Sequence, residues 1–214
     1  MSGRWIVLVA RPTPSGVERR SVDAVVDAVR AAIAEPVHVA FLDQADPSIP
    51  AVLDAAVAAG VESAVVVPLA VPADSYLTTW LSRAVANWRE TRHPVTLDVR
   101  LARGIAASAG LAGAVAAAVA AGGEPITSSP AAFRSPAWSQ LPANDRHLLV
   151  CRGPRCTSYG SGATHRALSK AARGTDALVT PVGCLGPCNL GPLVIEYPAG
   201  TWHRHVDEAL AEQL

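Results

Sequence analysis

Four cysteines are the residues of this chain with the clearest capacity for chemistry. Cys151 and Cys156 are separated by four residues, Cys184 and Cys188 by three, and 27 residues lie between the two pairs. Thiolates are the usual ligands of iron–sulfur clusters, and a 2Fe-2S cluster takes two of them on each iron. The two close pairs therefore predict one pair of ligands for each iron.

Zinc and disulfides are the alternative uses of the same thiols. Zinc also accepts four thiolates, although many zinc sites use cysteines that are two residues apart. The opening residues MSGRWIVLVARP lack the charged segment, long apolar run and cleavage site of a secretory signal. We therefore expect a cytoplasmic protein in a reducing compartment, where disulfides are rare.

Length and charge limit the other possibilities. The 214 residues can form two domains of ordinary size, and 18 basic residues balance 18 acidic ones without a basic run. We expect no nucleic-acid partner, because such partners select for clustered positive charge. The apolar stretch 104–123 is rich in Ala and Gly rather than Leu, which favours a packed helix of a soluble domain over a membrane span.

Short apolar runs alternate with helix-like periodicity through the first half of the chain. Strands are expected at 5–10, 37–42, 61–69 and 95–101, and helices at 17–34, 49–59, 76–90 and 105–121. This alternation predicts an α/β domain with a doubly wound parallel sheet over residues 1–122. Ligands of such sheets bind outside the carboxyl ends of the strands, so a site would be rimmed by 11–16, 43–48, 70–76 and 102–104.

Residues 123–146 are rich in Pro and Ser and are expected to link this domain to a second one over 147–214. The second domain should consist of strand 147–150, a cysteine loop 151–161, helix 162–173, strand 177–182, a cysteine loop 183–191, strands 192–197 and 201–206, and a final helix. This order is thioredoxin-like. Both cysteine pairs then follow the carboxyl ends of neighbouring strands, which would bring the two loops together.

The second domain resembles the thioredoxin-like 2Fe-2S ferredoxins over about 145–214. The resemblance rests on C-R-G-P-R-C, V-G-C-L-G-P-C-N-L-G-P and Y-P-A-G-T-W-H. It implies a 2Fe-2S cofactor held by Cys151, Cys156, Cys184 and Cys188, and a redox partner protein. Glycines at 183, 186 and 191 would allow the backbone to approach the cluster. The neighbouring Arg152 and Arg155 would either favour the reduced cluster or lie in solvent.

The first domain resembles the single-lobe sirohydrochlorin chelatases of the CbiX/SirB type over about 4–122. The matching segments are I-V-L-V-A, A-F-L-D-Q-A-D-P-S-I-P and S-A-V-V-V-P-L. Both histidines that deliver the metal in that family are missing, because Arg11-Pro12-Thr13 replaces the first motif and Tyr76 lies near the second. If metal insertion persists, Asp43, Asp74 and Tyr76 would have to replace the histidines.

Arg11 is permanently cationic, so it would repel a metal ion and suit a tetrapyrrole carboxylate or another anion. The favoured interpretation is a 2Fe-2S protein for electron transfer or redox sensing, with a degenerate chelatase-like domain that binds a tetrapyrrole or another anion. The alternatives are an active cobalt or iron chelatase of cobalamin or siroheme biosynthesis with a regulatory cluster, and a carrier that reports redox state. Because the single-lobe chelatases work as pairs of lobes, the resemblance also implies a homodimer.

Overall fold

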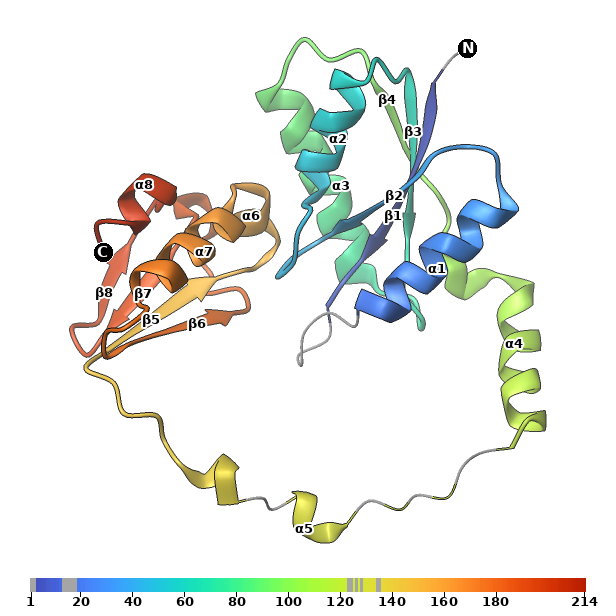
Figure 1. Ribbon diagram of the computed structural model, residues 1–214. Helices are drawn as coiled ribbons and strands as arrows, with labels where there is room; N and C mark the ends of the chain where they lie inside the picture. The colour runs from blue at the N-terminus through green and yellow to red at the C-terminus, as the bar shows by residue number, and fades with distance from the viewer. Residues whose placement is uncertain (1–2, 13–18, 123–124, 126, 128, 134–135) are drawn as a thin grey trace.

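The computed structural model describes residues 3–12, 19–122, 125, 127, 129–133 and 136–214, and contains two sheets (Figure 1). We call 3–122 the N-terminal module and 146–214 the C-terminal module. The N-terminal sheet has the order β2-β1-β3-β4 with every pairing parallel. Its strands are β1 (Arg4–Ala10), β2 (Val37–Phe41), β3 (Ser63–Pro68) and β4 (Asp98–Leu101).

Helices cover both faces of the N-terminal sheet, as the doubly wound prediction requires. Alternate residues of β1 point to opposite faces, so Val7 and Val9 pack under α2 (Ile49–Ala58) and α3 (Ser75–Thr91). Ile6 and Leu8 pack on the other face with Val26 of α1 (Arg19–Ala32). Burial on both faces explains why the strands read as continuous apolar runs.

The predicted packed helix 105–121 is wrong in two respects. A 3-10 turn at Ile105–Ala107 comes first, and α4 (Ala109–Ala120) begins after Ser108, whose hydroxyl accepts a hydrogen bond from the Gly110 N–H. None of the residues of α4 is buried, and Val119 is 75% exposed. The physical reason is that Ala and Gly occur on all sides of this helix, so no apolar stripe directs it onto the sheet.

Among the helices of the described residues, none combines the length and the apolarity needed to cross a membrane. Within the segment predicted to be a linker, the structure has a short helix α5 (Pro130–Phe133) and a 3-10 turn (Pro136–Ser139). Parts of the predictions for the loop 11–16, the helix 17–34 and the linker fall on 13–18, 123, 124, 126, 128, 134 and 135, which lie outside the described residues.

The C-terminal sheet has the order β6-β5-β7-β8. Strands β5 (Arg146–Cys151) and β6 (Ala177–Val182) are parallel, whereas β7 (Val194–Tyr197) and β8 (Thr201–His203) run antiparallel to their neighbours. Leu148 and Val150 of β5 pack with Leu168 of α7 (Ser161–Ala171) and Ala211 of α8 (Glu208–Ala211). This is the thioredoxin-like order that the sequence predicts.

Two details of the C-terminal module differ from the prediction. The expected cysteine loop 151–161 contains a short helix, α6 (Pro154–Ser158), which begins at a proline because proline suits the first helical position. The strand expected at 201–206 ends at His203, since His205 takes a positive φ of 50° and its N–H donates to the Leu190 carbonyl.

The loops at the carboxyl ends of β2 and β5 bring the two modules into contact (Figure 1). The Gln44 N–H donates to the Arg152 carbonyl at 2.9 Å. Ligands of α/β sheets bind at the carboxyl ends of the strands. The carboxyl edges of the N-terminal sheet and of the C-terminal sheet therefore meet at one place in the molecule.

Candidate functional site

The two cysteine pairs lie on neighbouring loops of the C-terminal module. β5 ends at Cys151, which pairs with Val182 at the end of β6, two residues before Cys184. Cys156 lies in α6, and Cys188 begins the 3-10 turn Cys188–Leu190. The Sγ atoms of Cys184 and Cys188 are 3.5 Å apart. Parallel pairing of β5 and β6 is thus what brings residues more than 30 positions apart into one site.

The first pair is buried and polarised. Cys151 and Cys156 are each 1% exposed. Their mutual hydrogen bond lowers the pKa of Cys151 and raises the pKa of Cys156. Backbone hydrogen bonds from Leu185 and Gly153 lower the pKa of Cys151 further, against the effect of its burial. The backbone therefore already favours a thiolate at Cys151, which is the form that binds metal.

The second pair is more accessible, and the two pairs act on each other electrostatically. Cys184 is exposed and Cys188 is half-buried. Burial raises the pKa of Cys188, the hydrogen bond with Cys184 raises it further, and the charge of Cys151 also contributes. Within the described residues, no three Cys, His, Asp or Glu side chains group closely enough to hold a single metal ion. The four thiols form two pairs, and a 2Fe-2S cluster takes one pair on each iron.

Glycines allow the cysteine loops to approach each other. A Cβ on Gly191 would lie 2.6 Å from Cys156 Sγ, and a Cβ on Gly153 would lie 2.9 Å from Cys184 Cβ. Gly186 has a φ of +111°, while a Cβ on Gly183 would meet no described atom within 4 Å. The sequence had indicated Gly191 but not Gly153, whose position directly before Pro154 at a helix start was the available signal.

Arg11, Asp43, Asp74 and Tyr76 lie together at the carboxyl edge of the N-terminal sheet. Arg11 Nε is 3.3 Å from Asp43 Oδ2, and Arg11 Nη1 is 3.6 Å from Asp74 Oδ2. The guanidinium carbon of Arg11 lies 4.4 Å from the centre of the Tyr76 ring. The sequence predicts that Arg11 binds an external anion. In the structure, Arg11 already has two carboxylates and an aromatic face as neighbours.

The two carboxylates have different environments. Asp43 is 2% exposed, and burial raises its pKa while Arg11 opposes this shift. Its Oδ1 has no hydrogen-bond partner among the described residues. Asp74 caps α3, because its Oδ1 accepts from the N–H groups of Tyr76 and Leu77 at 2.8 and 3.1 Å. Asp74 thus has a structural role in addition to its contact with Arg11.

Tyr76 responds to charges of both groups of residues. Burial raises its pKa, and the charge of Asp43 raises it further while Arg11 lowers it. The charges of Cys184 and Cys188 make smaller contributions that also raise it. Trp80 lies one turn further along α3, with its ring centre 6.2 Å from that of Tyr76.

Arg152 and Arg155 face the N-terminal module. Arg152 is 5% exposed, and its Nε and Nη2 have no partner among the described residues, so it is not a solvated loop residue. The guanidinium carbon of Arg155 lies 5.6 Å from the centre of the Trp80 ring, and its Nη1 donates to Asn189. Both arginines therefore belong to the contact between the modules.

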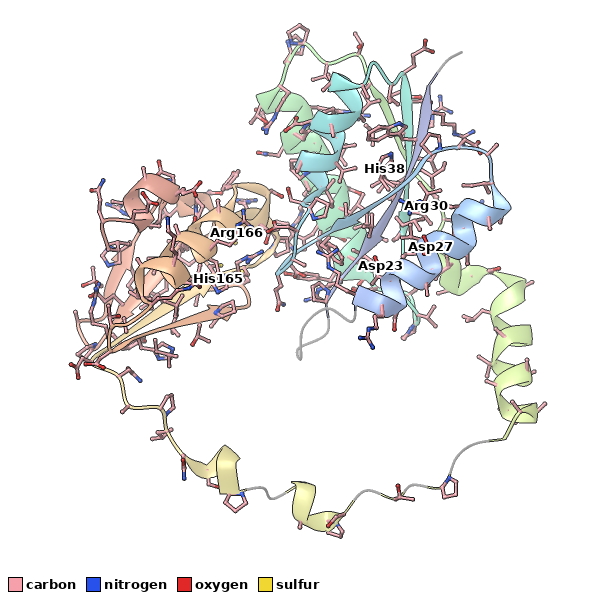
Figure 2. All side chains as sticks on the ribbon, viewed as in Figure 1. Asp23, Asp27, Arg30, His38, His165 and Arg166 are labelled. Atoms are coloured by element: carbon pink, nitrogen blue, oxygen red, sulfur yellow. The ribbon has the colours of Figure 1, made fainter. Side chains whose placement is uncertain are left out.

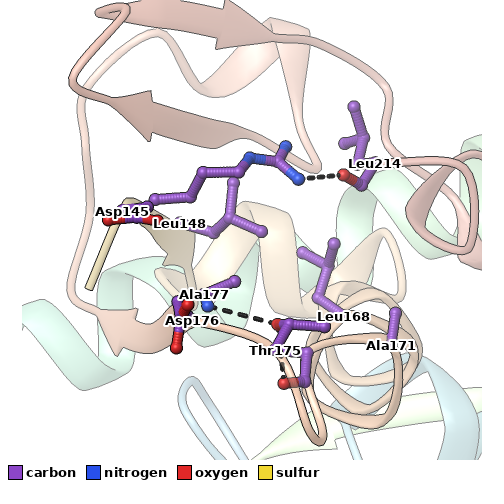
Figure 3. A pocket seen from close by; sticks show the side chains of 10 residues that line it. Asp145, Leu148, Leu168, Ala171, Thr175, Asp176, Ala177 and Leu214 are labelled. Atoms are coloured by element: carbon purple, nitrogen blue, oxygen red, sulfur yellow. Dashed lines mark hydrogen bonds between the residues drawn. The ribbon is translucent and has the colours of Figure 1, made fainter. Parts of the chain in front are cut away.

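Two hollows differ in their suitability as sites. An open cavity of about 520 Å³ is lined by Arg11, Asp74 and the segment 69–73, and its size suits a small-molecule ligand. Another hollow of about 290 Å³ lies in the C-terminal module between Leu148, Leu168 and Leu214 (Figure 3). It lies at the amino ends of β5 and β6, the opposite end of the sheet from the cysteines.

Comparisons with known proteins match the N-terminal module and the C-terminal module to different groups of proteins. Residues 5–121 match the model of the CbiX family. A "Putative 2Fe-2S ferredoxin" of Priestia megaterium is 32% identical over 80 residues, which cover 36% of this chain and 62% of that protein. The chain therefore spans less than two thirds of this relative. A "Ferredoxin, 2Fe-2S" of Aquifex aeolicus is 31% identical over 78 residues, which cover 30% of this chain and 69% of the relative.

Solved structures show similarity to the same two groups. The thioredoxin-like [2Fe-2S] ferredoxin from Aquifex aeolicus has a TM-score of 0.30 at 26% identity, covering 33% of this chain and 82% of its own. A putative cobalamin biosynthesis CbiX protein from Marinobacter aquaeolei VT8 has a TM-score of 0.45 at 24% identity, covering 55% and 95%. The chain belongs to the CbiX family through its N-terminal module and to the 2Fe-2S ferredoxins through its C-terminal module.

Proposed function

We propose that the C-terminal module binds one 2Fe-2S cluster through Cys151, Cys156, Cys184 and Cys188 and transfers single electrons or senses redox state. The observation that carries this proposal is the presence of two thiol pairs at the ends of adjacent parallel strands, with a glycine at each close contact. When bound, such a cluster supplies one-electron chemistry. The protein's part is to hold the thiolates and direct backbone N–H groups at them.

The two thiol pairs differ in exposure, and this difference indicates which side of the cluster exchanges electrons with a partner protein. Cys151 and Cys156 are buried, whereas Cys184 is exposed and Cys188 is half-buried. A redox partner protein would therefore approach the loop that carries Cys184 and Cys188, because electron transfer favours the side on which least protein intervenes.

We propose that the N-terminal module binds a tetrapyrrole or another anionic ligand in the cavity beside Arg11 without inserting a metal, with an anionic group of the ligand displacing the partly exposed Asp74 from Arg11. The CbiX match of this module and the volume of the cavity support the proposal. A metal ion at Asp43 and Asp74 would have to compete with the guanidinium that already contacts both carboxylates. The alternative, a cobalt or iron sirohydrochlorin chelatase, is supported by the convergence of the same two carboxylates. Incubation of the purified protein with sirohydrochlorin and Co²⁺ distinguishes the two, since insertion changes the visible spectrum of the tetrapyrrole.

Iron and acid-labile sulfide analysis, combined with EPR on anaerobically purified protein, tests the cluster. We expect two irons and two sulfides per chain and an EPR signal that appears only after reduction. Cys184→Ser should lose the cluster, while Asn189→Ser, a change in the same loop that leaves the four thiols, should retain it. Zinc without sulfide would reject the electron-transfer function.

A further inference from the structure

Helix α7 lacks an N-terminal cap of its own. Its N-cap residue is Gly160, no side chain makes the capping hydrogen bond, and the first turn contains no acidic residue. The first N–H groups of a helix have no partner within the helix, and the positive end of its dipole favours a negative charge. The helix is 11 residues long, so this end would benefit from a carboxylate supplied from elsewhere.

Asp46, from the loop after β2 in the other module, supplies that carboxylate. Both of its carboxylate oxygens lie 2.7 Å from the position that a Cβ on Gly162 would take, in the first turn of α7. Arg166, one turn further along α7, donates from Nη1 to Asp46 Oδ2 at 2.6 Å. Figure 2 shows Arg166 on α7 between the two modules. The carboxylate therefore lies against the first turn of α7 and forms an ion pair with a side chain of the same helix.

Charges of opposite sign meet across the rest of this contact. The N-terminal module contributes the acids Asp43 and Asp46, and the C-terminal module contributes Arg152 and Arg166, whose charges interact with them. The backbone bond from Gln44 to Arg152 fixes the register of the two loops. Complementary charge of this kind selects one docking geometry over others.

We propose that Asp46 is a docking residue that replaces the missing N-terminal acid of α7 and holds the C-terminal module as a fixed cover over the Asp43 edge of the N-terminal module. Since the two modules are covalently connected, a contact of modest strength is sufficient to keep them docked. Because both modules belong to one chain, the docking event is intramolecular, and its effective concentration is far above that of two separate proteins. With this edge covered, a ligand reaches the N-terminal site from the cavity beside Arg11 and Asp74.

Hydrogen exchange of the full-length, cluster-loaded protein provides a direct test. The Gln44 amide is protected by a bond between modules, whereas the nearby Leu42 amide donates to the Ala10 carbonyl inside the N-terminal module. Gln44 therefore reports docking, and Leu42 reports the fold of the N-terminal module. Small-angle scattering gives the corresponding change in the dimensions of the whole chain.

Two variants remove the contact from opposite sides. Asp46→Asn removes the charge, and Gly162→Ala places a methyl group where the carboxylate lies. Alanine favours a helix over glycine by about 1 kcal/mol, so Gly162→Ala weakens docking without weakening α7. Gly113→Ala is the matched control, because that helical glycine has no described atom within 4 Å of its Cβ position.

We expect exchange at Gln44 to become about threefold faster or more in both variants, because the Asp46–Arg166 pair is largely exposed and such pairs contribute little, with Leu42 unchanged and a larger radius of gyration. Unchanged protection of Gln44 in both variants would overturn the proposal. If Asp46→Asn also exposes Leu42, its own loop has lost its structure, and Gly162→Ala, which lies on the other module, decides the question.

Discussion

Arg11 and Asp43 form an ion pair at the carboxyl edge of the N-terminal sheet, with Arg11 Nε 3.3 Å from Asp43 Oδ2. Asp43 is almost fully buried, and burial raises its pKa, so Arg11 is the group that most favours its charged form. Removing one partner of such a pair leaves an uncompensated buried charge. The pair therefore controls whether the carboxylates of this site can accept a metal ion.

Arg11→Ala should convert the site into a cation site. Asp43 and Asp74 both lose their contact with the guanidinium, and a divalent ion can then compensate the two carboxylates. We expect the affinity for Co²⁺, measured by isothermal titration calorimetry, to rise by about tenfold or more. Arg103→Ala, a change at an exposed arginine of the 102–104 loop, should leave the affinity unchanged. Equal Co²⁺ binding by wild type and Arg11→Ala would contradict this role of Arg11.

Gly191→Ala should prevent cluster assembly. The added Cβ would lie 2.6 Å from Cys156 Sγ, which is closer than such atoms approach, so the ligand must move. We expect the variant to lose most of its iron, sulfide and visible absorption while it keeps the circular dichroism of the folded sheet. Gly113→Ala controls for the general effect of replacing glycine, and full iron content in Gly191→Ala would show that the loop adapts.

Glu196 should stabilise the C-terminal module in a pH-dependent manner. Its pKa is lowered first by the hydrogen bond from Arg146 and then by that from His203. A lowered pKa means that the stabilisation is present above the unfolded-state pKa of 4.5 and disappears as the pH falls through the lower folded-state value.

Glu196→Gln is therefore expected to reduce the unfolding free energy by about 1 kcal/mol at pH 7, a modest value because Arg146 is partly exposed. The difference from wild type should shrink as the pH falls below 4.5 and vanish once the pH is below the lowered folded-state pKa of Glu196. Urea denaturation at several pH values measures it, with the exposed Glu212→Gln as control. A difference independent of pH would show that the pair does not stabilise through its charge.

Helix α4 is the expected contact surface of a homodimer. Val115 and Val119 are 57% and 75% exposed, and none of the residues of this helix is buried in the chain. We expect wild type to sediment as a dimer and Val119→Glu as a monomer. Val57→Glu, at an exposed valine of α2, is the matched control and should remain dimeric. A monomeric wild-type protein would reject the homodimer.

Local pattern was sufficient for the order of the strands and helices in both modules, although not for every boundary. The alternation of apolar runs and helical periodicity predicted the parallel N-terminal sheet, because strand and helix periods depend on residues close in sequence. The order of the elements predicted that both cysteine pairs follow neighbouring strands, and the parallel pairing of β5 and β6 confirms this placement, while their role as cluster ligands stays a prediction.

Local pattern failed where contacts join distant residues. An Ala-rich helix carries no stripe to say whether it packs, so the exposure of α4 could not be read from residues 105–121. The ion pair of Arg11 depends on Asp43, 32 positions away, and Arg166 of α7 pairs with Asp46, 120 positions away. The sequence alone determined which residues have the chemistry of a cluster site and a carboxylate site, while the tertiary structure decided which charges neutralise each other, because that depends on how the two modules dock.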